Sequence, residues 1–130
     1  MEILLALLIE WLAVNTEITI ESPPTVVITE EAELYQRYDR PVHALYDDKS
    51  NTIYIADTVN LKTHQGASVL LHELVHHHQQ ESGAMEKFAC IRASEELAYN
   101  IQRQYLEGNK VELLPELDPF NVYMRSMCGM

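Results

Sequence analysis

The feature that most constrains this chain is a pair of histidines four residues apart in an apolar segment. His72 and His76 lie in the stretch from Ser68 to about Gln80, which contains no proline or glycine and is rich in leucine and valine. This composition predicts a helix that is buried in the core. Side chains four residues apart on a helix lie one turn above each other, so both imidazoles can bind one metal ion. A metal would satisfy two histidines that are otherwise costly to bury.

Glu73 follows the first histidine and completes the pattern HExxH. It projects about 100° further around the helix, where it cannot easily join the ligand set but can reach a water on the open side of the metal. Zinc lowers the pKa of a bound water to about 7, and a nearby carboxylate can accept the proton as the water attacks a carbonyl. The sequence therefore predicts one Zn²⁺ per chain, bound by His72 and His76, with Glu73 as the catalytic general base.

A catalytic zinc normally has three protein ligands and keeps one position for water. A third histidine at the spacing of the extended motif is excluded, because Gln79 and Ser82 stand where that motif needs glycine and histidine. A second helix is predicted from about Ala84 to Leu106, and it offers three carboxylates: Glu86, Glu95 and Glu96.

Helical angles distinguish these three glutamates. Glu96 projects about 100° away from Glu95, beside arginines on a face predicted to be solvated. Glu86 lies at the start of the helix, where the helix dipole is a sufficient explanation. Glu95 is the predicted third ligand, and the alternative is a buried hydrogen-bond acceptor without metal. It lies within a stripe predicted to face the core, formed by Phe88, Ile91, Ala98, Tyr99, Gln102 and Leu106.

The two segments His72-Glu73-Leu74-Val75-His76 and Glu95-Glu96-Leu97-Ala98-Tyr99 together resemble the gluzincin branch of the zincin metallopeptidases. In that branch, HExxH on one helix is completed by the glutamate of a Glu-x-x-Ala-like segment on a following helix. From about Val42 onwards the chain also resembles a small family of uncharacterised bacterial zincin-like proteins, often made with a secretory leader. The resemblance implies a zinc-dependent metallopeptidase with a minimal zincin-like core.

The resemblance also implies a strand beside the active-site helix that receives an extended substrate, since edge pairing is a common way to bind peptides. The expected substrate-binding edge strand is formed by Thr52, Ile53, Tyr54, Ile55 and Ala56.

One position departs from the gluzincin pattern. Many gluzincins orient a histidine ligand with an aspartate where this chain has Tyr99, so Tyr99 is a candidate for that role or for packing alone. His77, one turn past Glu73, is a second candidate near the site opening. A hydrolase of this class also needs a donor for the developing oxyanion. The sequence does not choose among Tyr54, His77, Tyr99, Tyr123 and Arg125 for this role.

The rest of the chain predicts one α+β domain over residues 1–130, with a small antiparallel or mixed sheet packed against a helical layer. Two further segments are predicted to be helices: the apolar Met1–Leu12 and the charged Glu30–Tyr38. Thr25–Thr29 is predicted to be a strand, and Val42–Tyr46 is predicted to form a hairpin with Thr52–Ala56. A short helix is expected to start near Asp118-Pro119.

Composition restricts the partners. With 20 acidic and 9 basic residues the net charge is −11, which argues against nucleic acid as a partner. The resemblance implies that the substrate is a peptide or protein. The apolar start, Met1–Leu12, is shorter than the roughly 20 residues of a membrane span and contains Glu2 and Glu10, so it is predicted to pack on the core. Because 130 residues leave little material for a cleft wall, a partner protein or a homodimer is a candidate to complete it.

Two questions stay open from the sequence. Cys90 and Cys128 do not have the spacing of a metal site or a redox motif, and the sequence is consistent with either one disulfide or two free thiols. Together with the family resemblance, the two cysteines favour a periplasmic or secreted protein over a cytoplasmic one. The alternative to a peptidase is a catalytically weak or inactive zinc-binding module for protein interaction, which would keep the same ligands.

Overall fold

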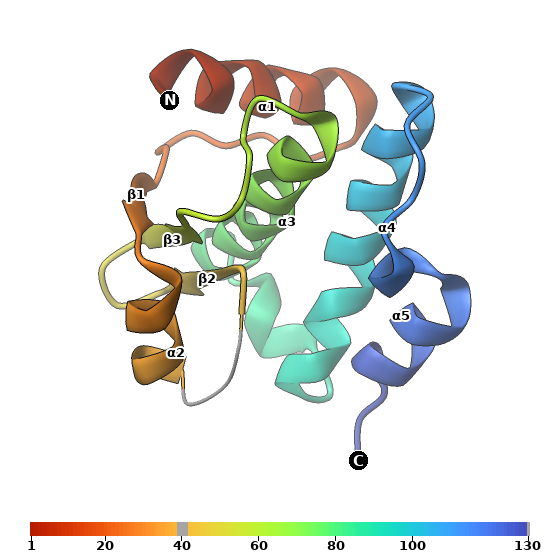
Figure 1. The fold of residues 1–130 in the computed structure, drawn as a ribbon. Coiled ribbons are helices and arrows are strands. Elements are labelled where there is room, and N and C mark those ends of the chain that lie inside the picture. Colours follow the sequence, from red (N-terminus) through yellow and green to blue (C-terminus); the bar gives the residue numbers. More distant parts are fainter. Residues whose placement is uncertain (39–41, 130) are drawn as a thin grey trace.

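The computed structural model describes residues 1–38 and 42–129 and has an α+β fold, as predicted (Figure 1). Its helices and strands follow in the order α1 (Glu2–Asn15), β1 (Thr25–Thr29), α2 (Glu31–Tyr38), β2 (Ala44–Asp47), β3 (Thr52–Ala56), α3 (His64–Glu81), α4 (Ser94–Gly108) and α5 (Pro119–Ser126). Three 3₁₀ helices, η1 (Ala84–Lys87), η2 (Ile91–Ala93) and η3 (Pro115–Leu117), lie in the connections.

The three strands form a mixed sheet in the order β1-β3-β2. The hairpin of β2 and β3 is confirmed, with Ala44 opposite Ile55 and Asp47 opposite Thr52. The prediction that Thr52–Ala56 is an edge strand is wrong, because β1 pairs with β3 in parallel on its other side. β1 is an uncharged, β-branched segment that can continue the sheet, and this pairing buries both edges of β3. The strand with an open edge beside α3 is instead β2.

Helix α3 runs through the centre of the molecule and packs on α4 and β2. It begins at His64, earlier than predicted, because the Thr63 hydroxyl caps the helix by accepting a hydrogen bond from the Gly66 amide at 3.0 Å. A Cβ atom at Gly66 would lie 1.8 Å from the Asn60 carbonyl oxygen, so glycine is required for this close approach. Further along, the buried face of α3 includes Leu70, Leu71, Leu74 and Val75, as its apolar sequence predicts.

The long helix predicted over Ala84–Leu106 is wrong in its first half. The segment that follows α3 turns through η1 and η2, and α4 begins only at Ser94. The backbone is extended at Phe88 and at Cys90, and Cys90 forms a disulfide with Cys128, 38 positions along the chain. Ile91, predicted to face the core, is 80% exposed, because it does not belong to the helix that carries the stripe.

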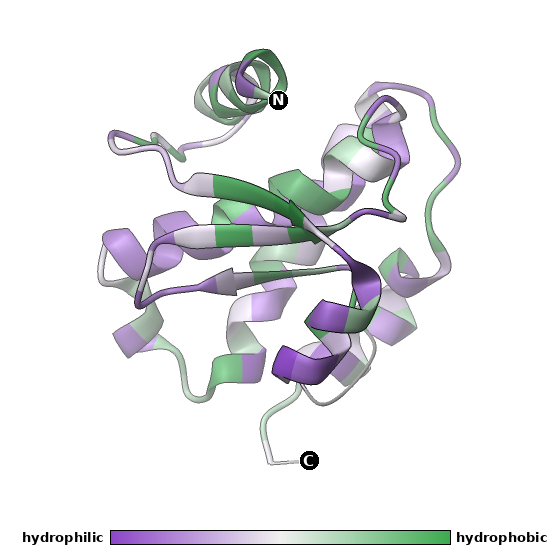
Figure 2. Ribbon diagram, turned by 60° about the vertical axis from the view of Figure 1, so that its left-hand side comes forward, coloured by the Kyte–Doolittle hydropathy of each residue, from purple (hydrophilic) through white to green (hydrophobic). Residues whose placement is uncertain are grey.

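Helix α1 packs on α3 and buries Leu8 and Leu12. Its outer side remains apolar at Ile3 and Val14, which are 78% and 74% exposed, and Figure 2 shows green segments around the whole helix. Among the described residues, no helix combines the length and apolarity that crossing a membrane requires.

Candidate metal centre

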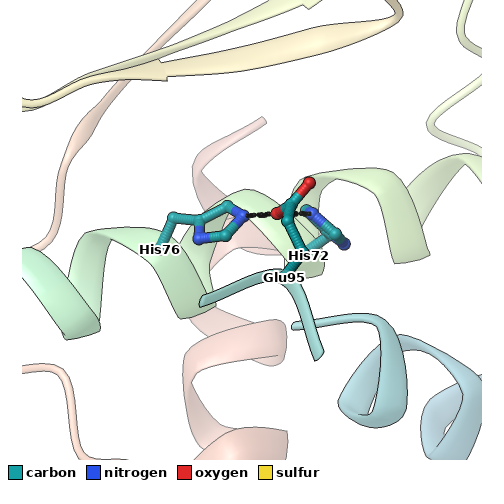
Figure 3. Close-up of side chains that lie close together, drawn as sticks. All are labelled: His72, His76 and Glu95. Carbon is teal, nitrogen blue, oxygen red and sulfur yellow. Dashed lines mark hydrogen bonds and ion pairs between the residues drawn. The ribbon is translucent and has the colours of Figure 1, made fainter. Parts of the chain in front are cut away.

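The structure brings the three predicted ligands, His72, His76 and Glu95, to one point (Figure 3). The Nε2 atoms of the two histidines lie 3.1 Å apart, and Nε2 of His72 lies 3.1 Å from Oε1 of Glu95. The same carboxylate oxygen contacts Nε2 of His76. A tetrahedral zinc with bonds of about 2.0–2.1 Å separates its ligand atoms by about 3.3 Å, so the donor set fits zinc and the two distances of 3.1 Å lie close to this value.

Gln79 orients the imidazole of His76. Nε2 of Gln79 donates to the backbone carbonyl of Ser94 at 3.0 Å, and because a carbonyl only accepts, the amide has one orientation. Oε1 of Gln79 then faces Nδ1 of His76 at 2.8 Å, and Nδ1 must carry the hydrogen. In neutral His76 this leaves the lone pair on Nε2, which points at the centre.

Gln102 orients His72 in the same way. The Ser68 hydroxyl donates to the Gln65 carbonyl at 2.6 Å and accepts from Nε2 of Gln102 at 3.0 Å. Oε1 of Gln102 therefore accepts from Nδ1 of His72 at 3.0 Å. Both imidazoles are thus held with Nε2 towards Glu95, which is the arrangement that second-shell partners give to metal-bound histidines.

The contacts of these two glutamines with the predicted ligands are not predicted from the sequence. From the sequence, Gln79 serves only to exclude the motif with a third histidine. Gln102 is assigned only to the stripe of α4 that is predicted to face the core. The signal was present in the spacing: Gln79 follows His76 by three positions, and Gln102 follows Glu95 by seven, two turns along the same face of α4. Both side chains are buried, at 1% and 3% exposure, where an amide needs partners.

Tyr99 does not hydrogen-bond to either histidine in the structure. Its ring packs on the His72 ring, with centres 4.5 Å apart, and its hydroxyl accepts from Nη1 of Arg125 at 3.2 Å. Tyr99 therefore contacts His72 by packing and does not orient its imidazole through a hydrogen bond, and Tyr99 also lines the cleft. Burial and the negative charge of Glu95 raise the pKa of the Tyr99 hydroxyl, so this phenol keeps its hydrogen at neutral pH.

The charges of the three residues favour a cation at the centre. Burial raises the pKa of Glu95, but the contacts of its carboxylate with the imidazoles of His72 and His76 outweigh burial and hold that pKa well below its ordinary value. Burial lowers the pKa of His76, but the bond to Glu95 and the charges of Glu73 and Glu95 raise it overall to about 9. Acceptor atoms that converge in this way need a positive charge, which a proton on His76 or a metal ion can supply.

Glu73 lies within the same cleft as the three ligands but is not one of them. It is 9% exposed, and burial raises the pKa of its carboxyl against the opposing effect of His72 and His76. The cleft has a volume of about 1050 Å³. Tyr46 of β2 lies along one part of the cleft, and η2 and α5 line another with Arg92 and Arg125.

His77 is wrong as a candidate near the site opening. It is 1% exposed, and its Nε2 donates to the Ser22 carbonyl at 2.7 Å while Nδ1 lies 3.0 Å from the Tyr46 hydroxyl. His77 therefore ties α3 to β2 and to the segment before β1. Two other candidate oxyanion donors, Tyr54 and Tyr123, are not among the described residues that line the cleft, which leaves Tyr99 and Arg125.

The fold and site together define an α+β protein with a partly buried histidine–histidine–glutamate cluster in an open cleft. The chain belongs to the DUF6647 family, which is described as a domain of unknown function and whose model matches residues 1–130. No curated protein and no solved structure matches the chain.

Proposed function

We propose that this protein is a zinc-dependent hydrolase of the gluzincin type that cleaves peptide bonds. The observation that carries the proposal is the convergence of His72 Nε2, His76 Nε2 and Glu95 Oε1, with Gln79 and Gln102 holding both imidazoles in the orientation for metal binding. Two histidines and one carboxylate make a common donor set for catalytic zinc, and it leaves one coordination position for water.

The residues around the centre supply the remaining chemistry. When bound, zinc lowers the pKa of water and polarises a carbonyl. Glu73 accepts the proton of the attacking water and passes it to the leaving amine, and its buried carboxyl with a raised pKa suits both steps. The hydroxyl of Tyr99, which accepts from Arg125, keeps its own hydrogen free to donate to the oxyanion.

The edge of β2 is the proposed docking strand for the substrate. Ala44, Leu45 and Tyr46 line the cleft, and the order β1-β3-β2 leaves the outer edge of β2 unpaired in the sheet. An extended peptide can add to this edge through main-chain hydrogen bonds and so lie across the centre. The disulfide supports a further proposal, that the protein works in an oxidising compartment outside the cytoplasm.

Metal analysis and hydrolysis assays test this proposal. We expect about one zinc per chain in the parent protein and loss of zinc in His76→Ala. The Glu73→Gln variant should keep zinc and lose hydrolysis of a casein-derived peptide mixture, measured by mass spectrometry. Glu96→Gln is the matched control on the exposed side of α4 and should behave as the parent does.

Three experimental results would contradict all or part of the proposed function. Absence of zinc in protein that was supplied with zinc and kept from chelators would refute the whole proposal. Equal hydrolysis by the parent and Glu73→Gln would refute the general base. Zinc binding without any hydrolysis would favour the alternative, a zinc-binding module for protein interaction.

A further inference from the structure

Two arginines line the metal cleft, and they are held differently. Arg92 donates from Nε to the carbonyl of Arg125 at 3.2 Å and from Nη2 to that of Met124 at 2.9 Å, so its guanidinium ties η2 to the end of α5. Among the residues that the structure describes, Arg125 donates only from Nη1, to the Tyr99 hydroxyl at 3.2 Å. Within residues 1–38 and 42–129, no carboxylate lies within 4.0 Å of its guanidinium.

The guanidinium of Arg125 is held close to the centre. Its Cζ lies 5.9 Å from the centre of the Tyr99 ring, and that ring lies 4.5 Å from the ring of His72. One aromatic ring therefore separates the cation from a predicted zinc ligand. The backbone is fixed on both sides, by the bonds from Arg92 and by the disulfide of Cys128 to Cys90.

A fixed cation of this kind has a specific use in a chain of net charge −11. The overall charge disfavours anionic ligands, so a guanidinium without an ion pair in the cleft selects for a carboxylate at one place. Its remaining N–H groups can bind a carboxylate with two parallel hydrogen bonds. Glu95 and Glu116 also line the cleft, but among the described residues neither carboxylate lies within 4.0 Å of the guanidinium.

We infer that Arg125 binds a carboxylate of the substrate close to the bond that is cleaved. The inference rests on the proposed function, and it names a substrate class: peptides with a carboxylate about one or two residues from that bond, given about 3.3–3.6 Å per extended residue. A free C-terminus and an aspartate or glutamate side chain offer the same chemistry. Arg125 is then a specificity-determining residue in addition to its contact with Tyr99.

Small thiol ligands test the inference without hydrolysis, because a thiolate can take the open position on zinc. The first pair is mercaptoacetyl-leucine with a free C-terminal carboxylate and the same compound with a C-terminal carboxamide. This pair tests whether Arg125 binds a C-terminal carboxylate. The other pair is mercaptoacetyl-aspartate amide and mercaptoacetyl-asparagine amide, which reports on a side chain. Dissociation constants are measured by calorimetry on the zinc-loaded protein, with zinc content checked separately.

We expect the carboxylate form of one pair to bind the parent at least about tenfold more tightly than its amide. Arg125→Met should reduce this preference to less than about twofold, and the side chain is exposed, so the variant should fold. Arg103→Met is the matched control, because Arg103 bonds to Asn100 and Glu107 on α4 and does not line the cleft. It should keep the preference of the parent.

The outcomes separate this inference from the proposed function. Equal affinities within both pairs would overturn the inference while thiol binding still supports a zinc site with an open position. A preference that persists in Arg125→Met would also overturn it. If none of the four ligands binds the zinc-loaded parent, the open zinc position itself is contradicted, and the inference fails with it.

Discussion

Replacing Gln102 with leucine tests whether the buried glutamines hold the centre in place. Gln102 is 3% exposed and links Nδ1 of His72 to the Ser68 hydroxyl through two bonds of 3.0 Å. Leucine has similar size but no polar atoms, so the N–H of His72 loses its partner, while Ser68 keeps its bond to Gln65. The unpartnered N–H should lower the free energy of unfolding of the zinc-free protein by about 1–3 kcal/mol.

The effect on zinc binding is a separate quantity. Loss of a second-shell partner typically weakens metal binding about 10- to 100-fold, which corresponds to about 1.4–2.7 kcal/mol. At a fixed, saturating free zinc concentration, the stabilisation by zinc falls by the same amount. In a domain of this size the increase in Tm on adding zinc should therefore be smaller by roughly 4–8 °C.

Thermal unfolding of zinc-free and zinc-loaded protein measures both quantities, and competition with a coloured chelator gives the dissociation constant of zinc. Gln104→Leu is the matched control, because Gln104 lies on the same helix and is exposed. Within the described part of the chain, its side chain bonds only to the Asn15 carbonyl, at 3.3 Å. If zinc raises the Tm of Gln102→Leu as much as that of the parent, the argument from the glutamines is refuted, whatever happens to the zinc-free protein.

Two further predictions concern the charge of the centre and the disulfide. The pKa of His76 is raised from 6.5 to about 9 in the metal-free protein, so its protonation stabilises the fold fully below pH 6.5, and this contribution is lost as pH rises through about 9. Zinc must displace that proton, so zinc binding at pH 7.5 should release about one proton per chain. Calorimetry in two buffers of different ionisation enthalpy measures this release, and binding heats that do not depend on the buffer would contradict it. Replacing Cys90 and Cys128 together with serine opens a loop of 38 residues and should lower the free energy of unfolding by about 4 kcal/mol, measured with denaturant. Reduction of the parent with dithiothreitol serves as the control, and unchanged stability in both samples would refute a role of the disulfide in holding η2 to α5.

The elements that the sequence predicted well are those fixed by local geometry. The buried helix around His72, Glu73 and His76 follows from the apolar run and from helical spacing, and both are properties of neighbouring residues. Glu95 was chosen from a stripe whose first members, Phe88 and Ile91, do not lie on the helix. The choice still brought the right side chain to the cluster, because Ala98, Tyr99 and Gln102 follow Glu95 on α4 itself.

The errors concern contacts between residues distant in the chain. Periodicity continued the helix back to Ala84, whereas a disulfide to a residue 38 positions away accompanies extended backbone at Cys90. The hairpin of β2 and β3 was readable from the turn between them, but the pairing of β1 with β3 was not, since strand order depends on where the chain returns.

The sequence by itself determined that this chain carries two histidines on one face of a buried helix and a glutamate beside them, with further glutamates on the helix that follows. Only the tertiary structure decided which partners hold the histidines, where the open strand edge lies, and that Arg125 faces the cleft. Helical spacing acts over one turn, so it is written in adjacent residues. The hydrogen bonds of Gln79 to Ser94 and of Gln102 to Ser68 join separate elements, and they exist only once α3 and α4 have packed.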